Sequence, residues 1–103
     1  MFDEILENGY KEYPVNSFMK CDKFFQKRFR DEKGTKYFID IEYFEYQGIL
    51  EPSFEYVVYF TVGEDNKAIR IRLYSGWSLT QVEEFVEKMW KTKLYNYYEK
   101  DKE

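Results

Sequence analysis

Three carboxylates lie close together in one stretch of the chain, at Asp40, Glu42 and Glu45. Carboxylates at this spacing could form a general acid/base pair or bind a hard cation such as Ca²⁺. In an extended strand Asp40 and Glu42 share one face, whereas Glu45 points to the other. The alternative is structural pairing with basic side chains of the preceding segment, namely Lys23, Lys27, Arg28 and Arg30. We favour this pairing because a basic strand is expected beside the acidic one.

The composition argues against most catalytic chemistry. The chain contains no histidine, which removes the commonest general base and the commonest metal ligand. A single cysteine, Cys21, can form neither an internal disulfide nor a zinc cluster. The five glycines are scattered, so no glycine-rich phosphate loop exists. We therefore expect a non-enzymatic binding protein without a metal or cofactor.

The acidic residues are concentrated in one segment. Residues 38–66 contain seven Asp or Glu side chains and neither Lys nor Arg. Such a segment could mimic nucleic acid and occupy the basic cleft of a partner protein. Its candidate contact residues are Asp40, Glu42, Glu45, Glu51 and Glu55.

A second candidate surface combines arginine with tyrosine. We expect Tyr59, Arg70, Arg72 and Tyr74 on the outer face of one hairpin, with Tyr59 opposite Arg70. These residues could be hot spots for a partner protein, or could stack on the bases of single-stranded nucleic acid. They could also interact within the chain, with Arg70 lying over Tyr59. The acidic pI of about 5.0 opposes the nucleic-acid alternative.

The N-terminal pattern predicts a short helix. Phe2, Ile5 and Leu6 follow helical spacing, and Asn8-Gly9 is a typical helix end. Residues 10–16 contain Pro14 and are expected to run extended. No basic leader with an apolar run follows Met1, and no apolar stretch approaches the ~18 residues that span a bilayer. We therefore expect no membrane contact and a cytoplasmic location.

Alternating side chains then predict two β-hairpins, over residues 21–46 and 54–73. In the second hairpin we place Phe60 opposite Ile69. The core face of the longer central strand is expected to consist of Tyr37, Ile39, Ile41 and Tyr43. Three phenylalanines would then lie on the outer face, namely Phe24, Phe38 and Phe44. An exposed row of this kind needs a cover, which could be the N-terminal segment, the second subunit of a homodimer or a bound partner.

Helical spacing dominates the C-terminal part of the chain. Ser78 and Gln81 form a capping box, and an apolar stripe continues from Leu79 to Tyr97. The predicted fold is therefore a single α+β domain over residues 1–103. It consists of a four-stranded antiparallel meander of two hairpins, packed by a long C-terminal helix, with a short N-terminal helix.

The stretches 36–41 (KYFIDI) and 78–90 (SLTQVEEFVEKMW) resemble small uncharacterised proteins of phages and prophages in low-GC Gram-positive bacteria. The resemblance implies an accessory role in which the protein binds and blocks a host factor, and it transfers no functional residue. The expected function is thus a protein–protein interaction module, such as an inhibitor of a host defence or nucleic-acid-processing protein. The alternative is single-stranded nucleic-acid binding through the Arg/Tyr face.

Overall fold

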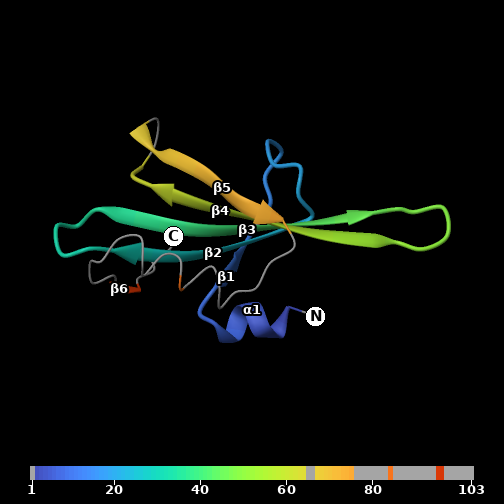
Figure 1. Cartoon of the computed structure of the whole chain (residues 1–103), viewed down its shortest axis with the longest axis horizontal. Coiled ribbons are helices and arrows are strands. Elements are labelled where there is room, and N and C mark those ends of the chain that lie inside the picture. The colour runs from blue at the N-terminus through green and yellow to red at the C-terminus, as the bar shows by residue number, and fades with distance from the viewer. Residues whose placement is uncertain (1, 65–66, 76–83, 85–94, 97–103) are drawn as a thin grey trace.

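The protein is built on one antiparallel sheet, seen in a computed structural model that describes residues 2–64, 67–75, 84 and 95–96 (Figure 1). Five strands follow the order β1-β2-β3-β4-β5, and β6 pairs with β2. The elements are α1 (Asp3–Glu7), β1 (Lys11–Tyr13), β2 (Lys23–Arg30), β3 (Lys36–Tyr46), β4 (Ser53–Val62), β5 (Ile69–Ser75) and β6 (Tyr95–Asn96).

The first predicted hairpin is confirmed as β2 and β3, which pair along the whole of β2. Its turn is shaped by Asp31, whose Oδ1 accepts hydrogen bonds of 2.9 Å from the backbone N–H groups of Lys33 and Thr35. Gly34 follows with a φ of 82°, a left-handed conformation that favours glycine. The turn chemistry thus fixes the register that brings Phe25 opposite Ile41.

The hydrophobic core lies on one face of this sheet. The predicted face of β3 is confirmed, because Tyr37, Ile39, Ile41 and Tyr43 are all buried. Helix α1 packs below the sheet in Figure 1 and adds Ile5 to the core. The core cluster consists of Ile5, Tyr10, Phe25, Tyr37, Ile39, Ile41, Val58 and Phe60.

The predicted fold class is wrong in two respects. The sheet has more than four strands, because Lys11–Tyr13 pairs with β2 as β1 and Tyr95–Asn96 pairs with Phe29 and Arg30 at the end of β2 as β6. No long C-terminal helix is seen in the described residues of this region, where Glu84 alone is helical and residues 95–96, at the expected end of the helix, form a strand. The rest of that prediction, except Glu84, lies outside the described residues. The spacing of apolar residues indicates which side of a segment is buried. It does not indicate that the segment pairs with a free strand edge, as β6 pairs with the edge of β2.

The second hairpin is confirmed, but its predicted register is wrong by two residues. Phe60 lies opposite Ile71 instead of Ile69, and Tyr59 lies opposite Arg72 instead of Arg70. A shift of two keeps every side chain on its face, so the alternating pattern could not detect it. An irregularity between Val58 and Tyr59 shifts the pairing once more.

The row of outer-face phenylalanines is partly covered in the structure. Phe24, Phe38 and Phe44 are each of intermediate exposure. The ring of Tyr13, on β1, lies 6.4 Å from the ring of Phe24. The N-terminal segment therefore covers one end of the row, which was the first of the alternatives considered.

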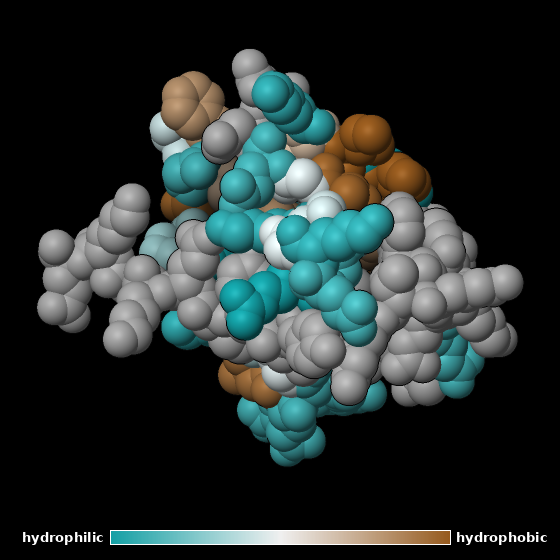
Figure 2. Space-filling model, turned by 90° about the vertical axis from the view of Figure 1, so that its left-hand side faces the viewer, coloured by the Kyte–Doolittle hydropathy of each residue, from teal (hydrophilic) through white to brown (hydrophobic). Residues whose placement is uncertain are grey.

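In the view onto the end of the molecule that carries the β2–β3 turn, hydrophilic side chains occupy the centre of the described surface and a hydrophobic group lies at its upper right (Figure 2). The part of the chain that the structure describes contains no helix with the length and hydropathy needed to cross a membrane.

Candidate functional site

The outer face of the sheet carries a cluster in which Arg70 joins three strands. Arg70 extends from β5 across the ring of Tyr59 on β4, with its guanidinium 3.7 Å from the ring centroid. Beyond that ring it donates a hydrogen bond of 2.7 Å to Glu42 Oε2 on β3. Its Nη2 also lies 3.6 Å from Asp40 Oδ2. Four of the predicted site residues, Asp40, Glu42, Tyr59 and Arg70, therefore meet in one place.

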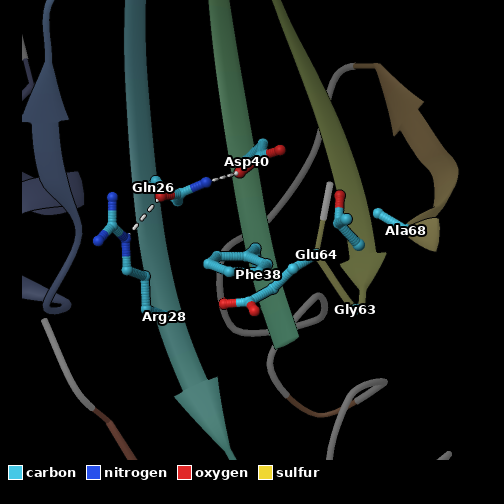
Figure 3. A pocket seen from close by; sticks show the side chains of 8 residues that line it. Gln26, Arg28, Phe38, Asp40, Gly63, Glu64 and Ala68 are labelled. Carbon is cyan, nitrogen blue, oxygen red and sulfur yellow. Dashed lines mark hydrogen bonds between the residues drawn. The ribbon is translucent and has the colours of Figure 1, made fainter. Parts of the chain in front are cut away.

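Asp40 is the buried member of this cluster, with 7% of its surface exposed. Gln26 donates a hydrogen bond of 2.8 Å to Asp40 Oδ1, and Arg28 Nε donates one of the same length to Gln26 Oε1 (Figure 3). Burial raises the pKa of the Asp40 carboxyl above its ordinary value, although the Gln26 hydrogen bond and the Arg70 charge oppose that rise. The carboxylate is thus held by neighbours on both sides.

The expected internal pairing of the acidic residues is found, with a different set of partners. Asp40 and Glu42 are paired with Arg70 of β5, and not with the lysines of β2. Lys23 pairs with Glu12 of β1, and Lys27 lies over the rings of Tyr10 and Phe29, 5.5 Å from each centroid. Arg70 on β5 reaches across β4 to the carboxylates on β3. The prediction considered only pairs between adjacent strands and therefore did not include this contact.

The other predicted acidic residues do not join this cluster. Glu45 lies on the opposite face, where the Tyr43 hydroxyl donates a hydrogen bond of 3.1 Å to its Oε1. Burial, together with that hydrogen bond, raises the pKa of Tyr43 to about 12. Glu55 lies opposite Phe44 on the outer face, and Glu51 lies in the exposed turn between β3 and β4.

The remaining predicted residues lie on β5. Arg72 is exposed opposite Tyr59, and it is not the arginine that stacks on this ring. Tyr74 pairs with Val58 through the backbone, and its side chain lies outside the described part. The predicted Arg/Tyr surface is thus reduced to an internal contact between Arg70 and Tyr59, which was the intramolecular alternative.

A feature missed by the sequence reasoning lies at the tip of the β3–β4 hairpin, which projects to the right of the sheet in Figure 1. Ile49 and Leu50 are fully exposed, at 103% and 97%. Tyr46 and Phe54, at the ends of the two strands, are about half exposed. We call these four residues the apolar tip. The available signal was two aliphatic residues between Gly48 and Pro52, where a turn normally places polar side chains.

The conformation of this tip requires glycine at position 48. A Cβ atom added to Gly48 would overlap the backbone carbonyl oxygen of Glu51. We expect Gly48→Ala to lower the free energy of unfolding by about 1 kcal/mol, because the native turn cannot accommodate the methyl group. Amide NMR shifts should change at residues 46–53 and stay unchanged in β2. Gly34→Ala is the matched control for position: its φ of 82° strains alanine, but its Cβ would meet no atom within 4 Å, so it should cost a similar free energy of unfolding and leave the shifts at residues 46–53 unchanged. Unchanged shifts at the tip in Gly48→Ala would contradict the expectation.

A cavity of about 450 Å³ opens beside Asp40, between the ends of β3 and β4. Its lining residues are Gln26, Arg28, Phe38, Asp40, Thr61, Gly63, Glu64 and Ala68. No group of three or more acidic or cysteine side chains in the described ranges is arranged to hold a metal ion.

No protein-family model, curated protein or solved structure matches the chain.

Proposed function

We propose that the protein is a non-enzymatic protein–protein interaction module that binds its partner through the β3–β4 hairpin. The observation that supports this most is the apolar tip, where Ile49 and Leu50 are fully exposed. Large apolar side chains exposed together at the end of a hairpin are in unfavourable contact with water, and burial against a partner removes that cost. Burying both in a pocket of the partner would gain about 3 kcal/mol or more, which is typical of interface hot spots.

The charges around the tip define the partner's surface. Glu45, Glu51 and Glu55 flank the tip, and the described residues place none of them in a salt bridge. A complementary partner would present an apolar pocket with a basic rim. Anionic membranes would be repelled by the same carboxylates, which favours a protein.

An inhibitor of a nucleic-acid-processing protein fits this description, with fewer acidic contact residues than the sequence suggested. Asp40 and Glu42 share one cation, Arg70, and Glu64 pairs with Lys36. In the described part of the acidic segment, the carboxylates without a salt bridge are those of Glu45, Glu51 and Glu55 beside the tip, and these are the ones that could mimic nucleic acid. The phage origin suggested by the resemblance would place the target among host proteins.

The test is a capture experiment with matched variants. The immobilised protein is incubated with lysate of a low-GC Gram-positive bacterium, and retained proteins are compared with those retained by Ile49→Asp/Leu50→Asp. We expect that a protein retained by the wild type binds the double variant at least 100-fold more weakly and is no longer retained by it. Phe18→Asp is the control, because Phe18 is 94% exposed and lies outside the hairpin.

Two outcomes would contradict the proposal. Equal loss with Phe18→Asp would mean that any exposed apolar residue serves, and retention by the double variant would exclude the tip. Binding to phosphatidylcholine vesicles that depends on Ile49 and Leu50 would make the tip a lipid contact instead. The triple variant Glu45→Gln/Glu51→Gln/Glu55→Gln should slow association about tenfold and flatten its salt dependence if the partner has a basic rim.

A further inference from the structure

The two outer edges of the sheet are built differently. One edge is β1, which is three residues long and has two exposed charged side chains, Lys11 and Glu12. Short strands with charged side chains protect an edge from further pairing. The other edge is β5, which is seven residues long and lies above β4 at the upper margin of the sheet in Figure 1. Among the strands that the structure describes, none pairs with the outer side of β5.

The first part of β5 is regular, and its side chains are exposed on both faces. Residues 69–72 are all exposed, and they pair with residues 62–59 of β4 in an unbroken register. The irregularity in this pairing comes only after Arg72. About every second residue of an antiparallel edge strand points its N–H and C=O groups outward. Residues 69–72 therefore offer backbone hydrogen bonds to an added strand.

The core side of this segment is apolar and incompletely covered. Ile69 and Ile71 are 64% and 46% exposed, although they lie opposite Val62 and the fully buried Phe60. Exposed isoleucines that continue a buried core form an apolar surface that a partner can cover. An added strand with apolar side chains on this side would extend the core across both isoleucines.

The outer side of the same segment selects for negative charge. Residues 67–72 contain Lys67, Arg70 and Arg72 and neither Asp nor Glu. Arg70 is directed inward, where it donates to Glu42. Arg72 is exposed and forms no salt bridge with any residue that the structure describes. A carboxylate directly opposite Arg72 on an added strand would form a cross-strand ion pair.

We propose that β5 binds an extended acidic segment of a partner protein as a further strand of the sheet. The apolar side chains of that segment cover Ile69 and Ile71, and one of its carboxylates lies opposite Arg72. In this mode of recognition the main-chain hydrogen bonds supply affinity, and the alternate side chains supply specificity. The surface shares no residue with the apolar tip, so the proposal does not rest on the function proposed for the hairpin.

Two other occupants fit this edge less well. A second copy of the chain that pairs through β5 about a twofold axis keeps the faces of the two strands aligned. Arginine then meets arginine, as when Arg70 lies opposite Arg72 across the axis, and like charges directly opposite are destabilising. A single-stranded nucleic acid supplies negative charge, but it lacks the alternating N–H and C=O groups that pair with a strand edge.

The probe for this surface is a synthetic eight-residue peptide in which glutamate alternates with valine. It is titrated into the ¹⁵N-labelled protein at physiological ionic strength. We expect alternate amides of residues 69–72 to become protected from hydrogen exchange, because they gain partners on the added strand. The same peptide with lysine in place of glutamate should bind at least about tenfold more weakly. Equal binding of the two peptides, or no protection in β5 by the glutamate peptide, would overturn the proposal.

Methylation of the peptide backbone tests the edge itself. Successive amides of a strand point to opposite edges, so N-methylation of the valines blocks one edge and N-methylation of the glutamates blocks the other. We expect one methylated peptide to lose binding and the other to retain it. If both retain it, the surface recognises charge alone and the proposal is wrong. Displacement of the parent peptide by (dT)₁₀ would then identify a surface for nucleic acid.

Charge reversal at Arg72 assigns the recognition to this strand. Arg72→Glu should weaken the glutamate peptide at least about tenfold and strengthen the lysine peptide, and the fold should be retained because the side chain is exposed. Lys33→Glu is the matched control, since it changes the net charge equally at an exposed position of the β2–β3 turn. Both peptides should bind this control within about twofold of the wild type, because distant charges are screened. Equal effects of the two variants would contradict the proposal.

The oligomeric state and the tip variant separate this proposal from its alternatives. A dimer in analytical ultracentrifugation whose β5 amides are already protected without peptide would overturn it, because the edge would then belong to a second copy. The Ile49→Asp/Leu50→Asp variant should bind the glutamate peptide as the wild type does. Failure of the hairpin proposal and failure of this one are therefore distinguishable.

Discussion

Replacing Phe25 with alanine is expected to lower the free energy of unfolding by about 3–5 kcal/mol. Phe25 is fully buried at the centre of β2, opposite Ile41 and in contact with the ring of Phe2 at 5.2 Å. The substitution would remove a whole ring between the sheet and the N-terminal segment, and α1 is too short to close the gap by itself. Urea denaturation followed by circular dichroism measures the change.

The control for this substitution is Phe18→Ala. Phe18 has the same side chain but is 94% exposed, so its loss should change the unfolding free energy by less than about 0.5 kcal/mol. A cost below 1 kcal/mol for Phe25→Ala, or equal costs for the two variants, would mean that the core does not lie where the structure places it.

Arg70→Ala is expected to cost about 1–2 kcal/mol at pH 7, because it leaves the carboxylates of Asp40 and Glu42 without their cation. Breaking a fully buried ion pair costs about 3–5 kcal/mol, but the Arg70 side chain is 44% exposed and water screens part of the loss. Arg72→Ala is the matched control, since Arg72 is exposed on the same strand and should cost less than about 0.5 kcal/mol.

The cost of Arg70→Ala should depend on pH in a defined direction. Burial raises the pKa of Asp40 in the folded protein above its unfolded value, so the folded state binds more protons between the two values. The stability contributed by this proton is full below the unfolded pKa and is lost as pH rises through the folded pKa. The charge of Arg70 lowers the pKa of Asp40 in the folded protein. Without Arg70 this pKa rises further, so more stability is lost when Asp40 ionises. The difference between wild type and variant should be larger at pH 7 than at pH 4; a difference that grows toward pH 4 would contradict the assignment.

The sequence allowed both hairpins, the short helix and the core face of β3 to be predicted, because alternation and turn residues act locally. Pairing between distant segments could not be predicted in the same way. The pattern at 95–96 gave no sign of β6, and the register of β4 with β5 depended on the turn, not on the alternating side chains. Local rules constrain which face is buried, whereas strand edges are matched by the whole fold.

The candidate site shows the same limit. The sequence placed Asp40 and Glu42 on one face, and the structure confirms that placement. It could not indicate that Arg70 would reach past Tyr59 to join them, since that contact depends on the β4–β5 register. Nor did it single out Ile49 and Leu50, because apolar residues in a turn are as readily explained by burial as by exposure. Only the position of the hairpin beyond the sheet decides between the two.

The pairing of β2 with both β1 and β6 has a consequence for biosynthesis. Strands β1 to β5 can assemble between neighbours as the chain leaves the ribosome, but Phe29 and Arg30 wait for Tyr95 and Asn96. Throughout that interval the end of β2 at Phe29 and Arg30 offers its backbone groups to any other extended chain. Nascent or truncated chains that stop before residue 95 are therefore the species most prone to self-association, and rapid completion of translation protects the protein from it.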